Sequence, residues 1–231
     1  YLVDEAPYFP ANEEESNTPE KLWRLLRRLG LDVITIAHHP KYGGRTDWSY
    51  RDDELQPLVE IYSIWGDSEK YGEYSVQSAL IKGHRLGIIA SSDNHIGQPG
   101  NPGNGLVAVI ARELTRESIF YSLKRRRCYG TTGSRILLNF KVNEHIMGEE
   151  FKISSKDDPR VIHVKVAGTA PIENIYIIRN NEEIKIFKNL GKIVDITYKD
   201  SEPLKGSTYY YIRIVQEDGE KAWSSPIWVD L

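Results

Sequence analysis

Five side chains of the kinds that bind metal ions stand at the ends of short apolar segments or inside one. They are His38, His39, Glu60, Asp93 and His95. Imidazoles and carboxylates are ligands that zinc, manganese and iron accept from proteins. The chain has one cysteine, so a thiolate metal cluster within one chain is excluded. The sequence therefore predicts a divalent metal site made of histidine and acidic residues.

Each of these residues also has an ordinary structural role open to it. A histidine after a strand can cap a loop, and Asp93 and His95 could belong to a simple turn, because Asp and Asn favour turns. Glu60 has apolar neighbours on both sides, so its charge would be costly to bury without a partner. Either a metal ion or an arginine, such as Arg45 or Arg51, would compensate that charge.

The segments that carry these residues alternate between predicted strands and helices. Strands are expected at residues 33–37, 58–63, 86–90 and 106–110 and near residue 129, and helices at 18–30, 75–82 and 115–126. Alternation of this kind favours a parallel sheet, whose ligands bind where loops leave the carboxyl ends of the strands. We therefore expect the five side chains to converge there.

A long polar loop and a glycine-rich loop are expected to border this site. The loop at residues 41–56 carries Lys41, Arg45 and Arg51, which we expect to contact a small anionic substrate. The glycines of residues 97–105 lack the spacing of a nucleotide-binding loop, so we expect a loop at the edge of the site.

The pattern changes near residue 135. Strands are expected at residues 136–142, 161–166, 175–179, 193–198, 209–215 and 222–228, with no helix between them. This arrangement predicts an α/β domain over residues 1–134 and a β-sandwich over 135–231. Five aromatic residues of the sandwich could serve its core or form an exposed glycan-binding platform: Tyr209, Tyr210, Tyr211, Trp223 and Trp228.

The overall composition narrows the possible partners and location. A net charge of −3 and a pI near 6.1 give no basic footprint for nucleic acid. Neither an apolar run long enough for a membrane helix nor a secretion signal in residues 1–15 is found, so we expect a cytoplasmic protein without membrane contact. Because the chain begins at Tyr1 rather than Met, we expect a piece of a longer protein.

Three stretches of the sequence resemble ligand motifs of the PHP (polymerase and histidinol phosphatase) superfamily, in particular its branch with a C-terminal β-sandwich. They are Ile-Ala-His-His-Pro at 36–40, Val-Glu-Ile-Tyr-Ser at 59–63 and Ser-Asp-Asn-His at 92–95. The resemblance implies part of a distorted (β/α)7 barrel, followed by an immunoglobulin-like sandwich, that holds divalent ions and hydrolyses phosphate esters. By position, His39 matches the ligand before proline, and Asp93 and His95 match the final ligand pair.

One departure from that pattern bears on the function. The family's opening His-x-His motif has no counterpart, because no two histidines are separated by a single residue here. We therefore expect a fragment, a barrel completed by another chain, or a domain without its chemistry.

Two functions follow as expectations. The first is a metal-dependent phosphoesterase in the complete protein, in which Asp93 binds metal and acts on the attacking water. The other is a non-catalytic fragment whose sandwich binds a glycan or a protein. An exposed row of aromatic side chains on the sandwich would favour the second.

Overall fold

Strands take up far more of the chain than helices in the computed structural model, which describes residues 1–2, 5–43, 45–98 and 104–231. The helices are α1 (Pro19–Arg28), α2 (Val76–Ile81) and α3 (Arg116–Lys124). Each begins after a hydroxyl residue whose side chain accepts a backbone N–H three residues later: Thr18, Ser75 and Thr115. Among the described residues, no helix is both long enough and apolar enough to cross a membrane.

A small mixed sheet carries the predicted site residues. Its strands are β1 (Ile36–Ala37), β2 (Leu58–Ser63), β3 (Gly66–Asp67) and β4 (Gly87–Ala90). Strands β1 and β4 lie parallel to β2 on its two edges, and β3 folds back antiparallel onto the end of β2. All four residues of β4 and five of the six in β2 are buried, as expected for strands covered on both faces.

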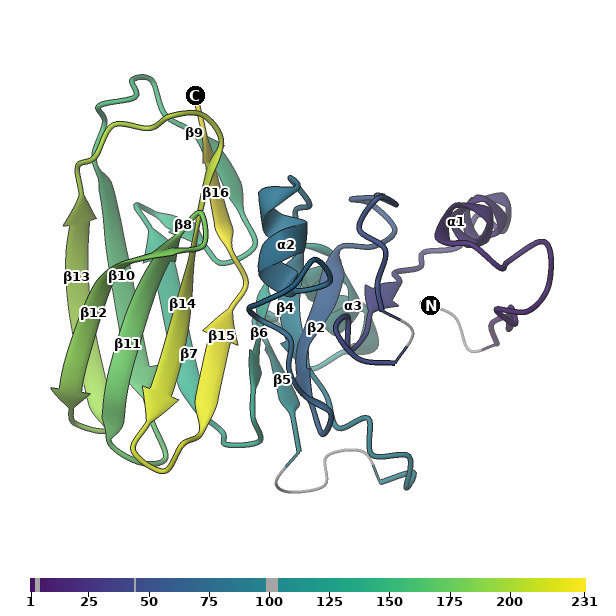
Figure 1. The fold of residues 1–231 in the computed structure, drawn as a ribbon, viewed down its shortest axis with the longest axis horizontal. Coiled ribbons are helices and arrows are strands. Elements are labelled where there is room, and N and C mark those ends of the chain that lie inside the picture. The colour runs from purple at the N-terminus through teal and green to yellow at the C-terminus, as the bar shows by residue number, and fades with distance from the viewer. Residues whose placement is uncertain (3–4, 44, 99–103) are drawn as a thin grey trace.

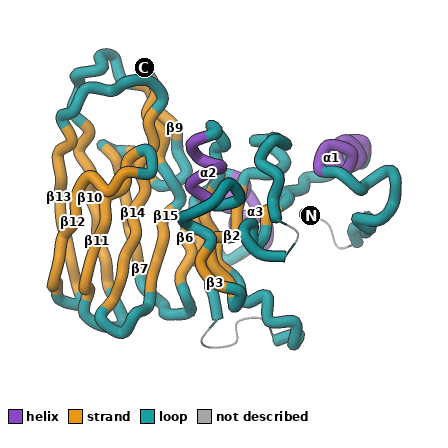
Figure 2. The backbone as a smooth tube through the Cα atoms, viewed as in Figure 1, coloured by secondary structure: helices purple, strands orange, loops and turns teal. Residues whose placement is uncertain are grey.

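Two further sheets face each other and form a sandwich (Figures 1 and 2). The smaller sheet has the order β13-β10-β7-β8 and comprises β7 (Leu137–Val142), β8 (His145–Ile146), β10 (Arg160–Ala167) and β13 (Ile193–Asp200). The larger sheet follows the order β12-β11-β14-β15-β6-β5, and β16 joins it through β14 and pairs with β9. Its strands are β5 (Leu106–Val109), β6 (Cys128–Thr131), β9 (Glu150–Lys152), β11 (Ile172–Arg179), β12 (Glu182–Leu190), β14 (Thr208–Gln216), β15 (Lys221–Ser224) and β16 (Ile227–Asp230).

Strand β14 is buried on both faces and joins the two apolar cores. Tyr210, Ile212 and Ile214 point into the sandwich core, while Tyr209 and Tyr211 belong to a second cluster with α2, β2 and β4. Successive residues of a strand point to opposite faces, so one strand serves both cores. The small sheet and α2 therefore pack against the outer face of the larger sheet, and α1 lies at the end of the molecule farthest from the sandwich (Figure 1).

The predicted (β/α)7 barrel is wrong. Helices and strands do alternate through α3, but β5 and β6 pair antiparallel, and β6 then pairs with β15 of the sandwich sheet. The fold in the described residues is mostly β, with several sheets. The alternation predicted the element types but not the strand partners. Strand β6 pairs with β15, a strand that comes much later in the chain.

A buried ionic cluster fastens the small sheet to the sandwich. The Glu69 carboxylate, 3% exposed, accepts two hydrogen bonds from Arg213 (2.8 and 3.0 Å), one from Tyr211 (2.8 Å) and one from Trp223 (3.0 Å). Glu183 supplies Arg213 with a second carboxylate. Since Tyr209, Tyr211, Trp223 and Trp228 are all buried at this junction, they do not form an exposed glycan-binding platform.

Candidate metal centre

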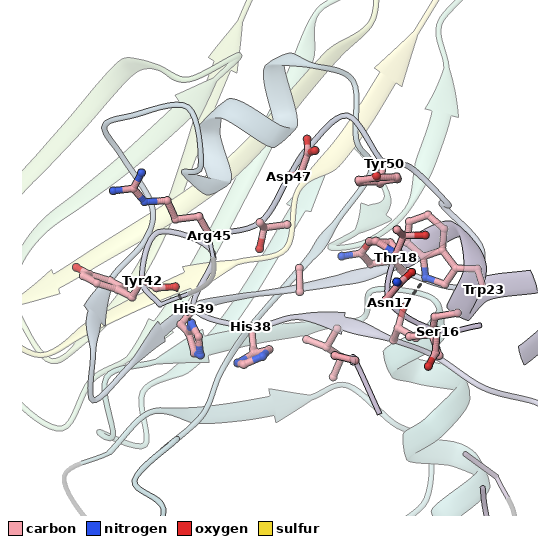
Figure 3. Close-up of a pocket in the computed structure, with 18 residues that line it drawn as sticks. Ser16, Asn17, Thr18, Trp23, His38, His39, Tyr42, Arg45, Asp47 and Tyr50 are labelled. Carbon is pink, nitrogen blue, oxygen red and sulfur yellow. Dashed lines mark hydrogen bonds between the residues drawn. The ribbon is translucent and has the colours of Figure 1, made fainter. Parts of the chain in front are cut away.

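Three of the five predicted ligands meet beyond the ends of the parallel strands. His38 and His39 follow β1, and Asp93 follows β4, with β2 between the two strands. Each of the three offers one ligand atom, and these atoms lie within 4.8 Å of one another. The two imidazoles stand nearly perpendicular with ring centroids 4.0 Å apart, and Figure 3 shows them side by side. We call His38, His39 and Asp93 the metal triad.

The hydrogen bond of His39 fixes which of its nitrogens can bind an ion. Its Nδ1 lies 3.0 Å from the carbonyl oxygen of Tyr42, which can only accept, so Nδ1 carries the proton. In the neutral ring, the lone pair then belongs to Nε2. That atom faces Oδ2 of Asp93 at 3.5 Å. Metal-binding histidines usually donate their other ring N–H to an acceptor such as this carbonyl oxygen, which sets the tautomer.

One carboxylate oxygen of Asp93 faces Nε2 of His39 and has no hydrogen-bond partner among the described residues. This oxygen is the buried Oδ2, whereas Oδ1 lies 3.0 Å from Nε2 of His95. A buried carboxylate oxygen left without a donor is costly. A cation between this oxygen and Nε2 of His39 would remove that cost, because both atoms are electron-pair donors.

The backbone adopts an unfavourable conformation at three of the five predicted ligands. His39, Asp93 and His95 have φ values of 29°, 46° and 56°, in the left-handed region that side chains with a Cβ seldom occupy. Such conformations cost on the order of 1 kcal/mol each and occur often at functional sites. Their occurrence at three predicted ligands favours a functional role for this region.

Glu60 is a positioning residue in this structure. One of its oxygens accepts the backbone N–H of His39 at 2.8 Å, and the other accepts the Ser91 hydroxyl. These two donors satisfy the buried carboxylate, which the sequence had led us to expect beside either a metal ion or an arginine. A register shift between Glu60 and Tyr62 in the β2–β4 pairing lies beside it. Glu60 thus connects the loop after β1 to the loop after β4.

The remaining predicted site residues do not join the metal triad. The His95 side chain is 75% exposed and orients Asp93 without joining the triad. Arg45 lies near the histidines with its guanidinium over the Tyr74 ring. Lys41 donates instead to the carbonyl oxygens of Asp67 and Lys70, and Arg51 forms an ion pair with Asp53. Of the predicted glycine-rich loop, residues 99–103 lie outside the described residues.

A cavity of about 690 Å³ opens beside the two histidines (Figure 3). It is bounded by the start of α1, by β1 and by the loop that follows β1. Sequence reasoning anticipated the loop but missed the α1 wall, because the residue pattern does not show that the start of this helix lies beside the end of β1, the next strand in the chain.

The spacing between His39 and Asp93 suits a divalent transition metal. Two ligand atoms bound at 2.0–2.1 Å to one tetrahedral ion lie about 3.4 Å apart, close to the 3.5 Å between His39 Nε2 and Asp93 Oδ2. The ligand set of two imidazoles and a carboxylate suits zinc, manganese or iron. Three protein ligands also leave a position open, as in catalytic rather than structural zinc sites.

The chain is similar to proteins whose functions are uncharacterised. A family model described as "Protein of unknown function (DUF3604)" matches residues 99–172. An uncharacterised protein of Chlamydia trachomatis is 35% identical over 219 residues, covering 77% of this chain and 35% of that protein. Another, from Chlamydia muridarum, is 34% identical over 245 residues, covering 87% and 38%. The chain thus spans about a third of the length of the curated relatives it matches.

Two of the solved structures that match show low sequence identity to this chain. Fibronectin(III)-like modules of CbhA from Clostridium thermocellum show 17% identity and a TM-score of 0.30, covering 39% of this chain and 93% of theirs. A CARDB domain from Pyrococcus furiosus shows 10% identity and a TM-score of 0.26, covering 42% of this chain and 96% of its own.

These comparisons correct the family prediction. Residues 99–172 match the DUF3604 model and not a PHP family, so the resemblance drawn from short motifs was wrong. The His-Pro, acidic-strand and Asp-x-His motifs are each short and common, which is why three motifs in the expected order misled. The uncharacterised relatives lend no support to a hydrolase assignment either, and any catalytic role must be argued from the triad alone.

Proposed function

We propose that the metal triad binds one divalent transition metal ion and that, in the longer protein, this ion acts on a small phosphate ester. The observation that carries the proposal is the pairing of Nε2 of His39 with the partnerless Oδ2 of Asp93 at 3.5 Å. Two electron-pair donors at this separation, without a proton donor between them, are suited to a cation.

The chain's own groups would hold and orient the reactants. A bound ion of this type supplies Lewis-acid polarisation of a phosphoryl oxygen and lowers the pKa of a coordinated water. Tyr42 and Glu60 hold His39 through its ring and its backbone, respectively. Asp93, our candidate catalytic residue, is fixed by His95 and can accept a hydrogen bond from water beside the ion.

The competing role, a sandwich that binds glycans through aromatic side chains, has less to support it. Its five aromatic residues are each 6% exposed or less. Burial leaves them no face for a sugar ring.

The first test is zinc stoichiometry after loading and exhaustive dialysis. We expect one zinc per chain, lost in Asp93→Ala and in His39→Ala but retained in His163→Ala. His163 is a suitable control because it lies on β10 and pairs with Thr197 far from the triad. Retention of zinc by all three variants would remove the triad as the binding site.

The second test is turnover of p-nitrophenyl phosphate by the metal-loaded chain. We expect turnover by the metal-loaded parent chain and none by Asp93→Ala. Zinc binding without any turnover of phosphate esters would keep the metal site and refute the phosphoesterase role.

A further inference from the structure

We infer that the cavity beside the triad binds the organic part of the substrate and that this part is uncharged and carries a flat ring. The inference rests on the proposed function, because it places the phosphate group at the triad. It adds the chemical class of the group to which that phosphate is attached, such as an aryl or nucleoside group.

The position of the cavity supports this arrangement. His38 and His39 line one end, and Trp23 and Tyr50 line the other (Figure 3). An ester whose phosphate contacts the triad must extend somewhere, and this cavity opens directly beside the histidines. Its volume of about 690 Å³ is within the range of small-molecule sites, roughly 300–1,000 Å³, and is far more than phosphate alone requires.

The end of the cavity farthest from the histidines is aromatic and rigid. Trp23 is buried, and its indole N–H donates to the Thr35 hydroxyl at 3.2 Å, so it forms the rigid base of this end and leaves the ligand contact to Tyr50. Tyr50 packs against the same apolar cluster and is only partly buried, so its ring remains accessible. Aromatic rings held in this way contact a planar ligand at a low entropic cost.

The charged side chains of the described lining form no cluster of cations for a second anionic group. Apart from the histidines, the charged residues of the described lining are Arg45 and Asp47, which have opposite signs. The Arg45 guanidinium lies over the Tyr74 ring, at 5.2 Å from its centroid. A second phosphate would meet no cluster of cations, whereas an uncharged ring would meet tyrosine and threonine side chains.

The test compares two non-hydrolysable phosphonates by calorimetry on the zinc-loaded chain. Phenylphosphonate carries a ring and methylphosphonate does not, while both present the same anionic group. We expect phenylphosphonate to bind about tenfold more tightly, in line with the usual strength of an aromatic contact. Tyr50→Ala should abolish most of that preference, and Tyr50→Phe, which keeps the ring, should retain it.

A matched control and a folding check make the outcomes distinct. Tyr71→Ala removes a tyrosine that is 84% exposed and outside the cavity lining, and it should leave the preference unchanged. Far-UV circular dichroism identifies a Tyr50→Ala protein that has not folded, in which case Tyr50→Leu replaces it. Equal binding of the two phosphonates, or a preference untouched by loss of the Tyr50 ring, overturns the inference. Failure to bind zinc at all would instead refute the proposed function.

Discussion

Replacing Glu69 with alanine should weaken the junction between the small sheet and the sandwich. The Glu69 carboxylate is the common acceptor for Arg213, Tyr211 and Trp223, which are all buried. Without it, Arg213 keeps one carboxylate partner, Glu183, while the tyrosine hydroxyl and the indole N–H lose their acceptor. Buried polar groups that lose a partner destabilise the folded state.

The magnitude follows from the nature of the pair. Removing one member of a buried ion pair typically costs 3–5 kcal/mol. Because Arg213 retains Glu183 and lies over the Tyr176 ring at 4.1 Å, we expect the lower end, about 3 kcal/mol. For a chain of this size, that corresponds to a fall in Tm of roughly 6–12 °C.

Urea unfolding followed by circular dichroism measures this loss directly. Glu73→Ala is the matched control, because Glu73 is exposed and four residues away from Glu69. The control should stay within about 0.5 kcal/mol of the parent. A loss below about 1 kcal/mol for Glu69→Ala would refute the view that this cluster fastens the two parts together.

Three further predictions concern the site and the buried titratable groups. Glu60→Ala should weaken zinc binding about 10- to 100-fold by titration, because Glu60 holds the His39 backbone; unchanged affinity would contradict that role. Burial raises the pKa of Cys128 to about 12, so at pH 8 its thiol stays protonated and iodoacetamide should modify it only after unfolding. Burial lowers the pKa of His84 below its ordinary 6.5, so the unfolded chain takes up the proton first as the pH falls. Stability should therefore decrease below pH 6.5 more steeply than in His84→Gln, and parallel curves would refute this.

Local sequence signals predicted most of the elements. Threonines before α1 and α3 mark both starts because their hydroxyls can accept an otherwise unpaired N–H. The apolar run of β2 was predicted at residues 58–63, where it is found. Parallel pairing of β1, β2 and β4 then brings His38, His39 and Asp93 together, as ligand convergence at strand ends requires.

The sequence pattern did not predict which strands pair when they lie far apart in the chain. The barrel prediction failed because β6 pairs with β15, some 90 residues later. Strand β12 was missed, since its polar and charged residues are largely exposed and show no apolar alternation. The sequence of β14 also did not show that a second layer covers the strand face with Tyr209 and Tyr211.

The roles within the site also depended on contacts that spacing does not reveal. The partners of Glu60 are a backbone N–H and the Ser91 hydroxyl, neither of which has a sequence signature. Similarly, the choice of His39 over His95 for the triad depends on the turn that directs His95 toward solvent.

The most direct test of the metal triad is long-range ¹H–¹⁵N NMR of the histidine side chains during titration with zinc. We predict that Nε2 of His39 shifts to a metal-bound value, that its Nδ1 keeps the proton donated to Tyr42, and that His38 also shifts. His145 and His163 should not respond. If His39 shows no change at one equivalent of zinc, or if all the histidines respond alike, the metal site proposed here is contradicted.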